Sequence, residues 1–172
     1  MLDVDTAAGA CAGSNIVMYL SNSTELGWVE VIDSADHDST HELASISVSF
    51  GLAEAAEIWT EWAMESVNDS LKAAAAPDIP VCIAASDDGF DDQVGDGRDF
   101  PASEPFVLAV CGTTLIRNAG ALTEVAWKEG DRLRQDGGGS TGGGVRVVCP
   151  VPICRPLTLH LSIQERRKED AF

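Results

Sequence analysis

A chain of 172 residues is long enough for one domain with a hydrophobic core, and its 45% hydrophobic content argues against disorder. Its 11 basic and 28 acidic residues give a net charge of −17, which disfavours binding to nucleic acid or to an anionic membrane because like charges repel. No apolar run approaches the ~20 residues that span a bilayer, and the first residues lack the basic and apolar regions of a signal peptide.

The first part of the chain predicts a helix, a strand and a second helix. Residues 2–12 are Ala-rich and predict a helix, and the apolar run at 16–20 predicts a strand. Residues 25–35 predict another helix by their 3.6-residue period. Its apolar stripe comprises Leu26, Val29, Ile32 and in part Val31.

The next elements continue this alternation. Apolar runs predict strands at 44–50, 81–85 and 106–111, and a helix is expected within 53–76, ended by Pro77. The apolar residues of that helix at near-helical spacing are Ile58, Trp62, Val67 and Leu71. Strands that are apolar at nearly every position are typical of a parallel sheet covered on both faces, so we expect an α/β domain with right-handed crossovers.

After Cys111 the character of the sequence changes. Residues 113–116 and 123–127 predict an antiparallel pair around a turn at Asn118-Ala119-Gly120, and a Gly-rich segment follows at 137–144. From Pro156 the chain becomes highly charged and shows no apolar partner, so we expect residues 156–172 to form a loose C-terminal tail. Residues 1–155 are then the folded domain.

Five cysteines cannot pair completely within one chain, and their surroundings favour no bond. Cys82 and Cys111 lie in apolar runs typical of small core residues. Cys149 and Cys154 have a spacing that matches no zinc site. We therefore expect neither a disulfide nor a metal.

Ligands of open parallel sheets bind at the carboxyl ends of the strands, and two such ends carry distinctive loops here. The strand at 44–50 leads into Ser49-Phe50-Gly51, and the strand at 81–85 leads into an acidic loop at 86–92. Carboxylates in that loop could serve proton chemistry or bind a cation, or the loop could be an ordinary acidic turn. The spacing is not that of an EF-hand.

Several familiar catalytic and nucleotide-binding motifs are missing. The Gly-rich segment has no G-K-[ST] ending, no G-x-G-x-x-G opens a helix, and no G-x-S-x-G occurs. The three histidines, His37, His41 and His160, lie in polar contexts typical of solvated side chains. A Ser-His-Asp triad therefore has no obvious base.

Five segments together resemble the sedolisin (serine-carboxyl peptidase) family. The most specific is residues 100–115, similar to the family's FPAS-x-P-x-VLAVGGTTL with Cys111 in place of Gly. The others are residues 140–145, followed by two prolines, and residues 2–3, 46–51 and 85–89. These segments occur in family order from Met1 to about Pro152.

The resemblance implies a subtilisin-like parallel sheet with helices on both faces, here truncated, and an acid-acting serine-type endopeptidase. The family uses a Ser nucleophile, a Glu base, an Asp that supports the Glu and an Asp in the oxyanion hole. Asp3 matches the supporting Asp and Asp87 the oxyanion-hole Asp. Ser49 and Gly51 match the strand that pairs with an extended peptide, so the implied partners are peptide or protein substrates. The family is also secreted.

Departures from the family pattern predict that this chain is inactive alone. The catalytic Glu would precede Met1, and no G-T-S nucleophile motif follows Pro152. Phe50 replaces a Trp, which removes an indole donor. The family's calcium site would also lie in the missing C-terminal part, so no cofactor is expected.

Two other functions stay open. One is a non-catalytic homologue that binds extended peptides through residues 49–51, and the other is a small α/β domain that binds a cation through residues 87–92. A shortened parallel sheet also exposes an unpaired edge, through which we expect self-association.

Overall fold

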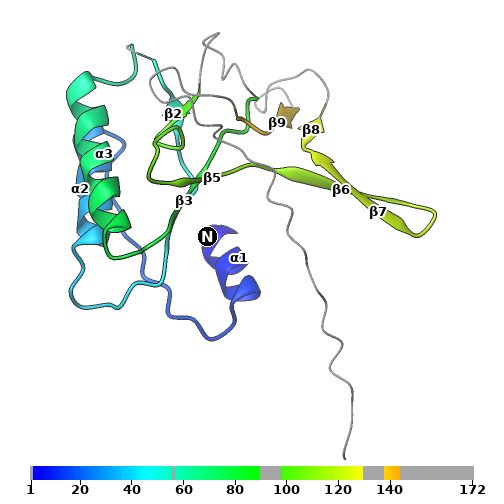
Figure 1. Ribbon diagram of the computed structural model, residues 1–172, viewed down its shortest axis with the longest axis horizontal. Coiled ribbons are helices and arrows are strands. Elements are labelled where there is room, and N and C mark those ends of the chain that lie inside the picture. The colour runs from blue at the N-terminus through cyan, green and yellow to red at the C-terminus, as the bar shows by residue number, and fades with distance from the viewer. Residues whose placement is uncertain (1, 56, 90–97, 130–137, 144–172) are drawn as a thin grey trace, which may run out of the picture.

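The computed structural model describes residues 2–55, 57–89, 98–129 and 138–143. At its centre is a three-stranded parallel sheet of β1 (Ile46–Val48), β3 (Val81–Ala84) and β5 (Leu108–Val110), in the order β1-β3-β5 (Figure 1). Strand β3 is central because both neighbours pair with it, β1 at Ile46 to Val81 and β5 at Cys82 to Leu108. The predicted α/β arrangement is confirmed.

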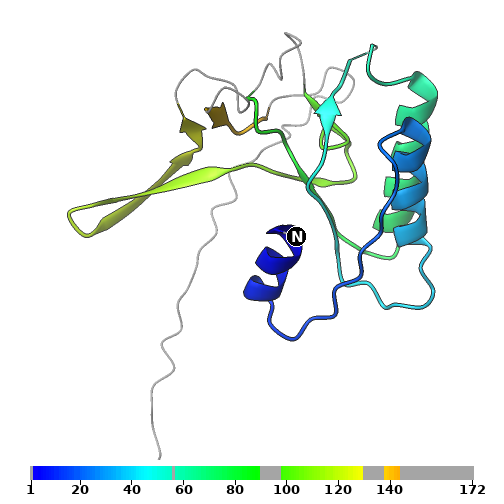
Figure 2. The same cartoon turned by 180° about the vertical axis from the view of Figure 1, so that it is seen from behind.

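Helices lie on both sides of this sheet, as predicted. Helices α2 (Glu25–Asp36) and α3 (Glu61–Ala75) pack together on one side, and α1 (Leu2–Ala10) lies on the other (Figures 1 and 2). The alternation within β3 follows from this arrangement, since Val81 and Ile83 are buried toward α2 and α3 while Cys82 and Ala84 are only partly buried.

Helix α3 begins later than the sequence predicts. Thr60 is its N-cap, and its hydroxyl accepts a hydrogen bond from the Ala63 N–H at 3.3 Å. The residues before it pair instead, because β2 (Leu52–Ala53) lies antiparallel to β4 (Asp99–Phe100). Helix α2 has the equivalent cap, in which the Thr24 hydroxyl accepts from the Gly27 N–H at 3.1 Å.

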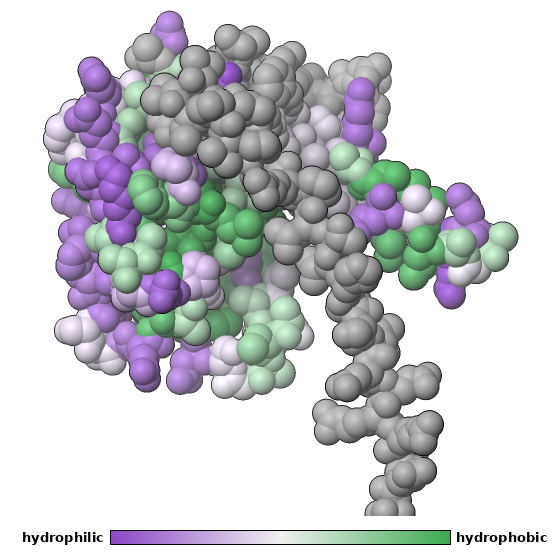
Figure 3. Space-filling model, in the orientation of Figure 1, coloured by the Kyte–Doolittle hydropathy of each residue, from purple (hydrophilic) through white to green (hydrophobic). Residues whose placement is uncertain are grey.

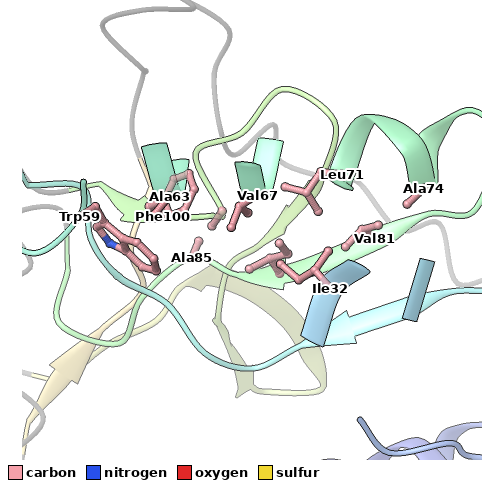
Figure 4. Close-up of a cluster of buried hydrophobic side chains, with 11 residues drawn as sticks. Ile32, Trp59, Ala63, Val67, Leu71, Ala74, Val81, Ala85 and Phe100 are labelled. Carbon is pink, nitrogen blue, oxygen red and sulfur yellow. The ribbon is translucent and has the colours of Figure 1, made fainter. Parts of the chain in front are cut away.

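The hydrophobic core lies between α2, α3 and the sheet (Figure 4). Its aromatic part is a chain of edge-to-face contacts in which Trp59 lies 5.8 Å from Trp28 and 4.7 Å from Phe100, measured between ring centroids. Full burial of one large apolar side chain contributes roughly 1.5–3 kcal/mol. The core residues are Ile32, Trp59, Ala63, Val67, Leu71, Ala74, Val81, Ile83, Ala85, Phe100 and Ala102.

Three residues of the predicted apolar stripes are wrong. The buried apolar residues of α3 are Ala63, Val67, Leu71 and Ala74, whereas Trp62 is 56% exposed. Ile58 precedes the helix and is also exposed. In α2, Leu26 is exposed. Trp62 directly precedes the buried Ala63, and Leu26 directly precedes the buried Gly27. Spacing alone therefore placed each of these two residues on the wrong face of its helix.

The predicted hairpin is present and longer than expected. Strands β6 (Thr113–Asn118) and β7 (Ala121–Ala126) are joined by Ala119 and Gly120, whose φ angles of 48° and 90° fit the two-residue turn that matches strand twist. Figure 1 shows this hairpin projecting from the rest of the molecule. A second short pair joins β8 (Lys128–Glu129) to β9 (Gly139–Ser140).

Two predictions are contradicted. Residues 16–20 are extended but form no ladder with any strand that the structure describes, and they run beside α2 with Ile16, Met18 and Leu20 exposed. An apolar run favours a strand, yet a strand also needs a neighbour to pair with.

Cys111 is disulfide-bonded, whereas Cys11 and Cys82 are free thiols, so the expectation of no disulfide is wrong. The apolar run around Cys111 predicts that the residue is buried, but it does not indicate whether another cysteine lies close enough to form a disulfide.

Residues 144–172, with the predicted tail and the boundary at 155, lie outside the described residues. Within the described ranges, no helix is long and apolar enough to cross a membrane.

Candidate functional site

The carboxyl ends of β1 and β3 lie at the same end of the sheet, because the two strands are parallel and Val48 pairs with Ile83. Ser49 follows β1 directly, and Asp87 follows β3 after two intervening residues. The structure therefore brings the loops that carry Ser49, Gly51 and Asp87 to one end of the sheet, where ligands of open parallel sheets bind.

Asp3 reaches the same region from α1. The Ser49 hydroxyl donates a hydrogen bond to Asp3 Oδ1 at 2.7 Å, between residues 46 positions apart in the chain. Helix α1 buries none of its side chains, and among the described residues this is the one side-chain hydrogen bond that an α1 residue makes. The carboxylate of Asp3 is therefore held at the carboxyl end of β1 by Ser49.

Residues of β4 lie close to the backbone of Gly51. A Cβ at this position would lie 2.9 Å from Asp99 Oδ2 and 3.3 Å from the Phe100 carbonyl oxygen, so a larger residue would press on β4. The neighbouring Phe50 side chain is 71% exposed and does not join the core. The segment from Ser49 to Gly51 thus presents one open side, on which an extended chain could lie.

Asp87 lies in a tightly bonded loop. Ser86 has a φ of 97°, which is costly for a residue with a side chain, and its hydroxyl accepts a hydrogen bond from the Asp88 N–H at 3.1 Å. Residues 139–142 lie against this loop, since the Ser140 N–H donates to the Asp87 carbonyl and the Gly142 N–H to the Ser86 carbonyl. The sequence does not predict this contact. Its one signal is the number of glycines in the segment.

A metal centre is not evident in the residues that the structure describes, where no three His, Cys, Asp or Glu side chains are grouped to hold an ion. The cation-binding alternative relied on residues 87–92, of which residues 90–92 lie outside the described residues.

The strongest electrostatic effects lie at the opposite end of the sheet, before β1. Hydrogen bonds from Tyr19, His41 and the Thr40 N–H hold the pKa of Asp38 well below its usual range, and the same contact raises the pKa of Tyr19. His41 Nδ1 lies 2.6 Å from Asp38 Oδ2, and the Thr40 N–H lies 2.6 Å from Oδ1. His37 and His41 are exposed, in agreement with their predicted solvation.

Comparison with known proteins gives related sequences and a related structure. The chain is 37% identical over 155 residues to kumamolisin of Bacillus sp. (strain MN-32), covering 88% of this chain and 27% of that protein. It is 30% identical over 164 residues to tripeptidyl-peptidase sed5 of Aspergillus fumigatus, covering 87% of this chain and 27% of that protein. The chain therefore spans about a quarter of the length of these curated relatives.

A solved structure matches as well. Pseudomonas sedolisin, a serine-carboxyl proteinase complexed with two molecules of pseudo-iodotyrostatin, superposes with a TM-score of 0.60 at 28% identity, covering 73% of this chain and 36% of that one. No profile of a known protein family matches this chain.

Proposed function

Most of this chain matches part of the sedolisin-family peptidases, and from that premise we propose that it forms part of the catalytic domain of an acid-acting serine-type endopeptidase. Its substrates are peptides or proteins, which pair with residues 49–51. The chain by itself does not hydrolyse them.

The observation that carries this proposal is the hydrogen bond between Ser49 and Asp3. The bond joins the first turn of α1 to the end of β1, although α1 has no buried side chain to hold it there. An acidic side chain kept beside an open strand end is what a supporting carboxylate requires. The same end of the sheet carries Asp87.

The chemistry follows from carboxyl groups, which can donate or accept protons in acidic solution. In acid, Asp3 supports the carboxyl that takes the proton of the nucleophile. A carboxylic acid at the position of Asp87 donates a hydrogen bond to the oxyanion that forms on the peptide carbonyl, which stabilises the transition state. Neither step involves a metal or cofactor.

The proposed inactivity of the isolated chain is supported by motifs that its sequence lacks. Helix α1 contains no glutamate, and the sequence contains no G-T-S motif. No residue of the chain therefore matches the family's base or nucleophile by motif. A disulfide at Cys111 supports an oxidising compartment, such as the outside of a cell, as its working environment.

The open position of β1 favours a second function, the binding of extended peptides without cleavage. In the described sheet β1 is an outer strand, and both Ser49 and Phe50 are exposed beside it. Main-chain groups at a sheet edge bind extended peptides by adding a strand.

A peptidase assay with a binding assay tests both functions. We expect the purified chain to give no turnover of quenched fluorescent peptides between pH 3 and pH 7, with Pseudomonas sedolisin, a serine-carboxyl proteinase, assayed in parallel as the positive control. Turnover that survives purification and disappears in Asp87→Asn would show that the chain is active and would contradict the proposal. Binding of an uncleaved peptide, weakened by Gly51→Val but not by Gly120→Val in the distant hairpin turn, would favour the second function.

A further inference from the structure

We propose that residues 139–142, here called the glycine strap, position Asp87, and that Thr141 is the positioning residue that anchors the strap. The inference rests on the proposed role of Asp87 in the candidate active site.

The strap binds the Asp87 loop through backbone groups. The Ser140 N–H donates to the Asp87 carbonyl at 2.9 Å, and the Gly89 N–H donates to the Ser140 carbonyl at 2.9 Å. The Gly142 N–H donates to the Ser86 carbonyl at 3.1 Å. These bonds lie on both sides of Asp87, so the strap restrains the residues before and after it.

The restraint acts where the backbone is strained. Ser86 has a φ of 97°, in a region that non-glycine residues avoid, and such a residue persists only when its surroundings hold it. The bond from Gly142 and the turn closed by the Ser86 hydroxyl supply that support. Because Ser86 sets the direction in which the chain enters Asp87, the strap sets where the Asp87 side chain is placed.

The glycines of the strap are required by close contact. A Cβ on Gly142 would lie 1.7 Å from the Ala85 carbonyl oxygen, which is impossible without displacing the strap. A Cβ on Gly139 would lie 2.7 Å from Cη2 of Trp127 and 3.2 Å from the Asp87 carbonyl oxygen. The strap therefore lies directly on the loop and on the indole ring.

Thr141 ties the strap to the end of β5. Its hydroxyl accepts a hydrogen bond from the Gly112 N–H at 2.7 Å, and its own N–H donates to the Trp127 carbonyl at 3.0 Å. Trp127 in turn donates its N–H to the Gly112 carbonyl at 3.1 Å. Because Gly112 follows β5 of the central sheet by two residues, Thr141 connects the Asp87 loop to the segment that leaves this sheet.

Such a device suits a residue that must face a developing charge. Hydrogen-bond donors stabilise a transition state when they are held in place before the reaction, because no energy is then needed to orient them. A loop with a strained residue would not stay in one conformation without an external support. The strap and its threonine anchor provide it.

The test removes the anchor and observes Asp87 by NMR in the intact chain labelled with carboxyl-carbon-13 aspartate. Thr141→Val keeps the shape of the side chain but cannot accept from Gly112. We expect it to move the Asp87 carboxyl signal and to accelerate amide hydrogen exchange of Gly89 and Ser140 at least tenfold, with exchange in α3 unchanged. Thr141→Ser keeps the hydroxyl and should restore both.

Thr113→Val is the matched control, since it deletes a threonine hydroxyl that bonds Glu124 within the nearby hairpin. It should leave Asp87 unchanged. Gly142→Ala should reproduce the effect of Thr141→Val, and if it fails to fold, the threonine variants decide. An unmoved Asp87 signal in Thr141→Val, or equal acceleration throughout the molecule, would overturn the proposal. None of these measurements depends on peptide hydrolysis. The proposed role of the glycine strap can therefore be contradicted without contradicting the proposed peptidase function, and the reverse also holds.

Discussion

Two carboxylates show how differently single residues are held in this protein. Asp3 accepts a hydrogen bond from Ser49 at the carboxyl end of β1, in an exposed position. Asp38 accepts bonds from Tyr19, Thr40 and His41 at the other end of the strand. The second arrangement fixes the segment before α2 to the loop after it, and it stabilises the ionised form of the carboxyl group.

The pH dependence of stability is expected to follow Asp38. Because its pKa is lowered on folding, its contribution is fully present above the ordinary value of 3.8 and is lost as the pH falls through the lower folded pKa. Asp38→Asn should therefore lower the melting temperature by a few degrees at pH 6 and by progressively less as the pH is brought well below 3.8. Thermal unfolding followed by circular dichroism measures both. Asp5→Asn, in exposed α1, controls for general loss of charge. An equal effect of Asp38→Asn at pH 6 and pH 2 would contradict this explanation.

At the scale of elements, α3 does most to hold the sheet in place. It contributes Ala63, Val67, Leu71 and Ala74 to the core, all fully buried against the sheet or α2. Small residues at two of these four positions let the helix approach the sheet closely. The opposite face of α3 is solvated, with Trp62 exposed. Burial in α3 is therefore restricted to one narrow row.

Two substitutions in α3 test this assignment. Leu71→Ala should lower the free energy of unfolding by about 2–5 kcal/mol, because it removes a fully buried side chain and leaves a cavity. Trp62→Ala should change it by less than about 1 kcal/mol, although tryptophan is the larger residue, because surface substitutions have small effects. Urea denaturation measures both values. Comparable losses for the two variants would place the buried face of the helix elsewhere.

At the scale of the whole molecule, apolar side chains are exposed on one face of the described sheet. Leu108 and Val110 of β5 are 45% and 50% exposed on the face of the sheet away from α2 and α3. Figure 3 shows further apolar residues along the projecting hairpin of β6 and β7. Parallel sheets are normally covered on both faces, and the curated relatives are nearly four times as long as the matched segment. In the relatives, additional polypeptide is available to cover such a surface.

We propose that the isolated chain self-associates at β5, through the outer edge of the described sheet and the apolar face that Leu108 forms there, more strongly in acid. At neutral pH the net charge of −17 keeps copies apart, and protonation of carboxylates near pH 4 reduces this repulsion. Sedimentation velocity should show a larger dimer fraction at pH 4 than at pH 7. Leu108→Lys should reduce it, whereas Leu122→Lys in the hairpin should not. A monomer at both pH values would exclude association by this edge.

Much of the fold could be predicted from the sequence, because helices and strands follow local periodicity. Helices α1 and α2, strands β1, β3 and β5 and the hairpin turn at Ala119-Gly120 all lie where the pattern puts them. The partial match to the sedolisin peptidases also needed only short ordered motifs, such as residues 100–115. The end of the sheet that carries Asp87 followed from the order of the elements, because parallel strands share their carboxyl edge.

Contacts between distant residues were decided by the tertiary structure alone. The amino acids of Ser49 and Asp3 do not reveal that they are bonded, nor do glycines 139 and 142 reveal that they lie on the Asp87 loop. Residues 16–20 have the composition of a strand, and the path of the backbone gives them no described partner. The physical reason is common to all three cases. Local conformation depends on neighbours along the chain, whereas pairing and close approach depend on where the folded backbone brings other segments.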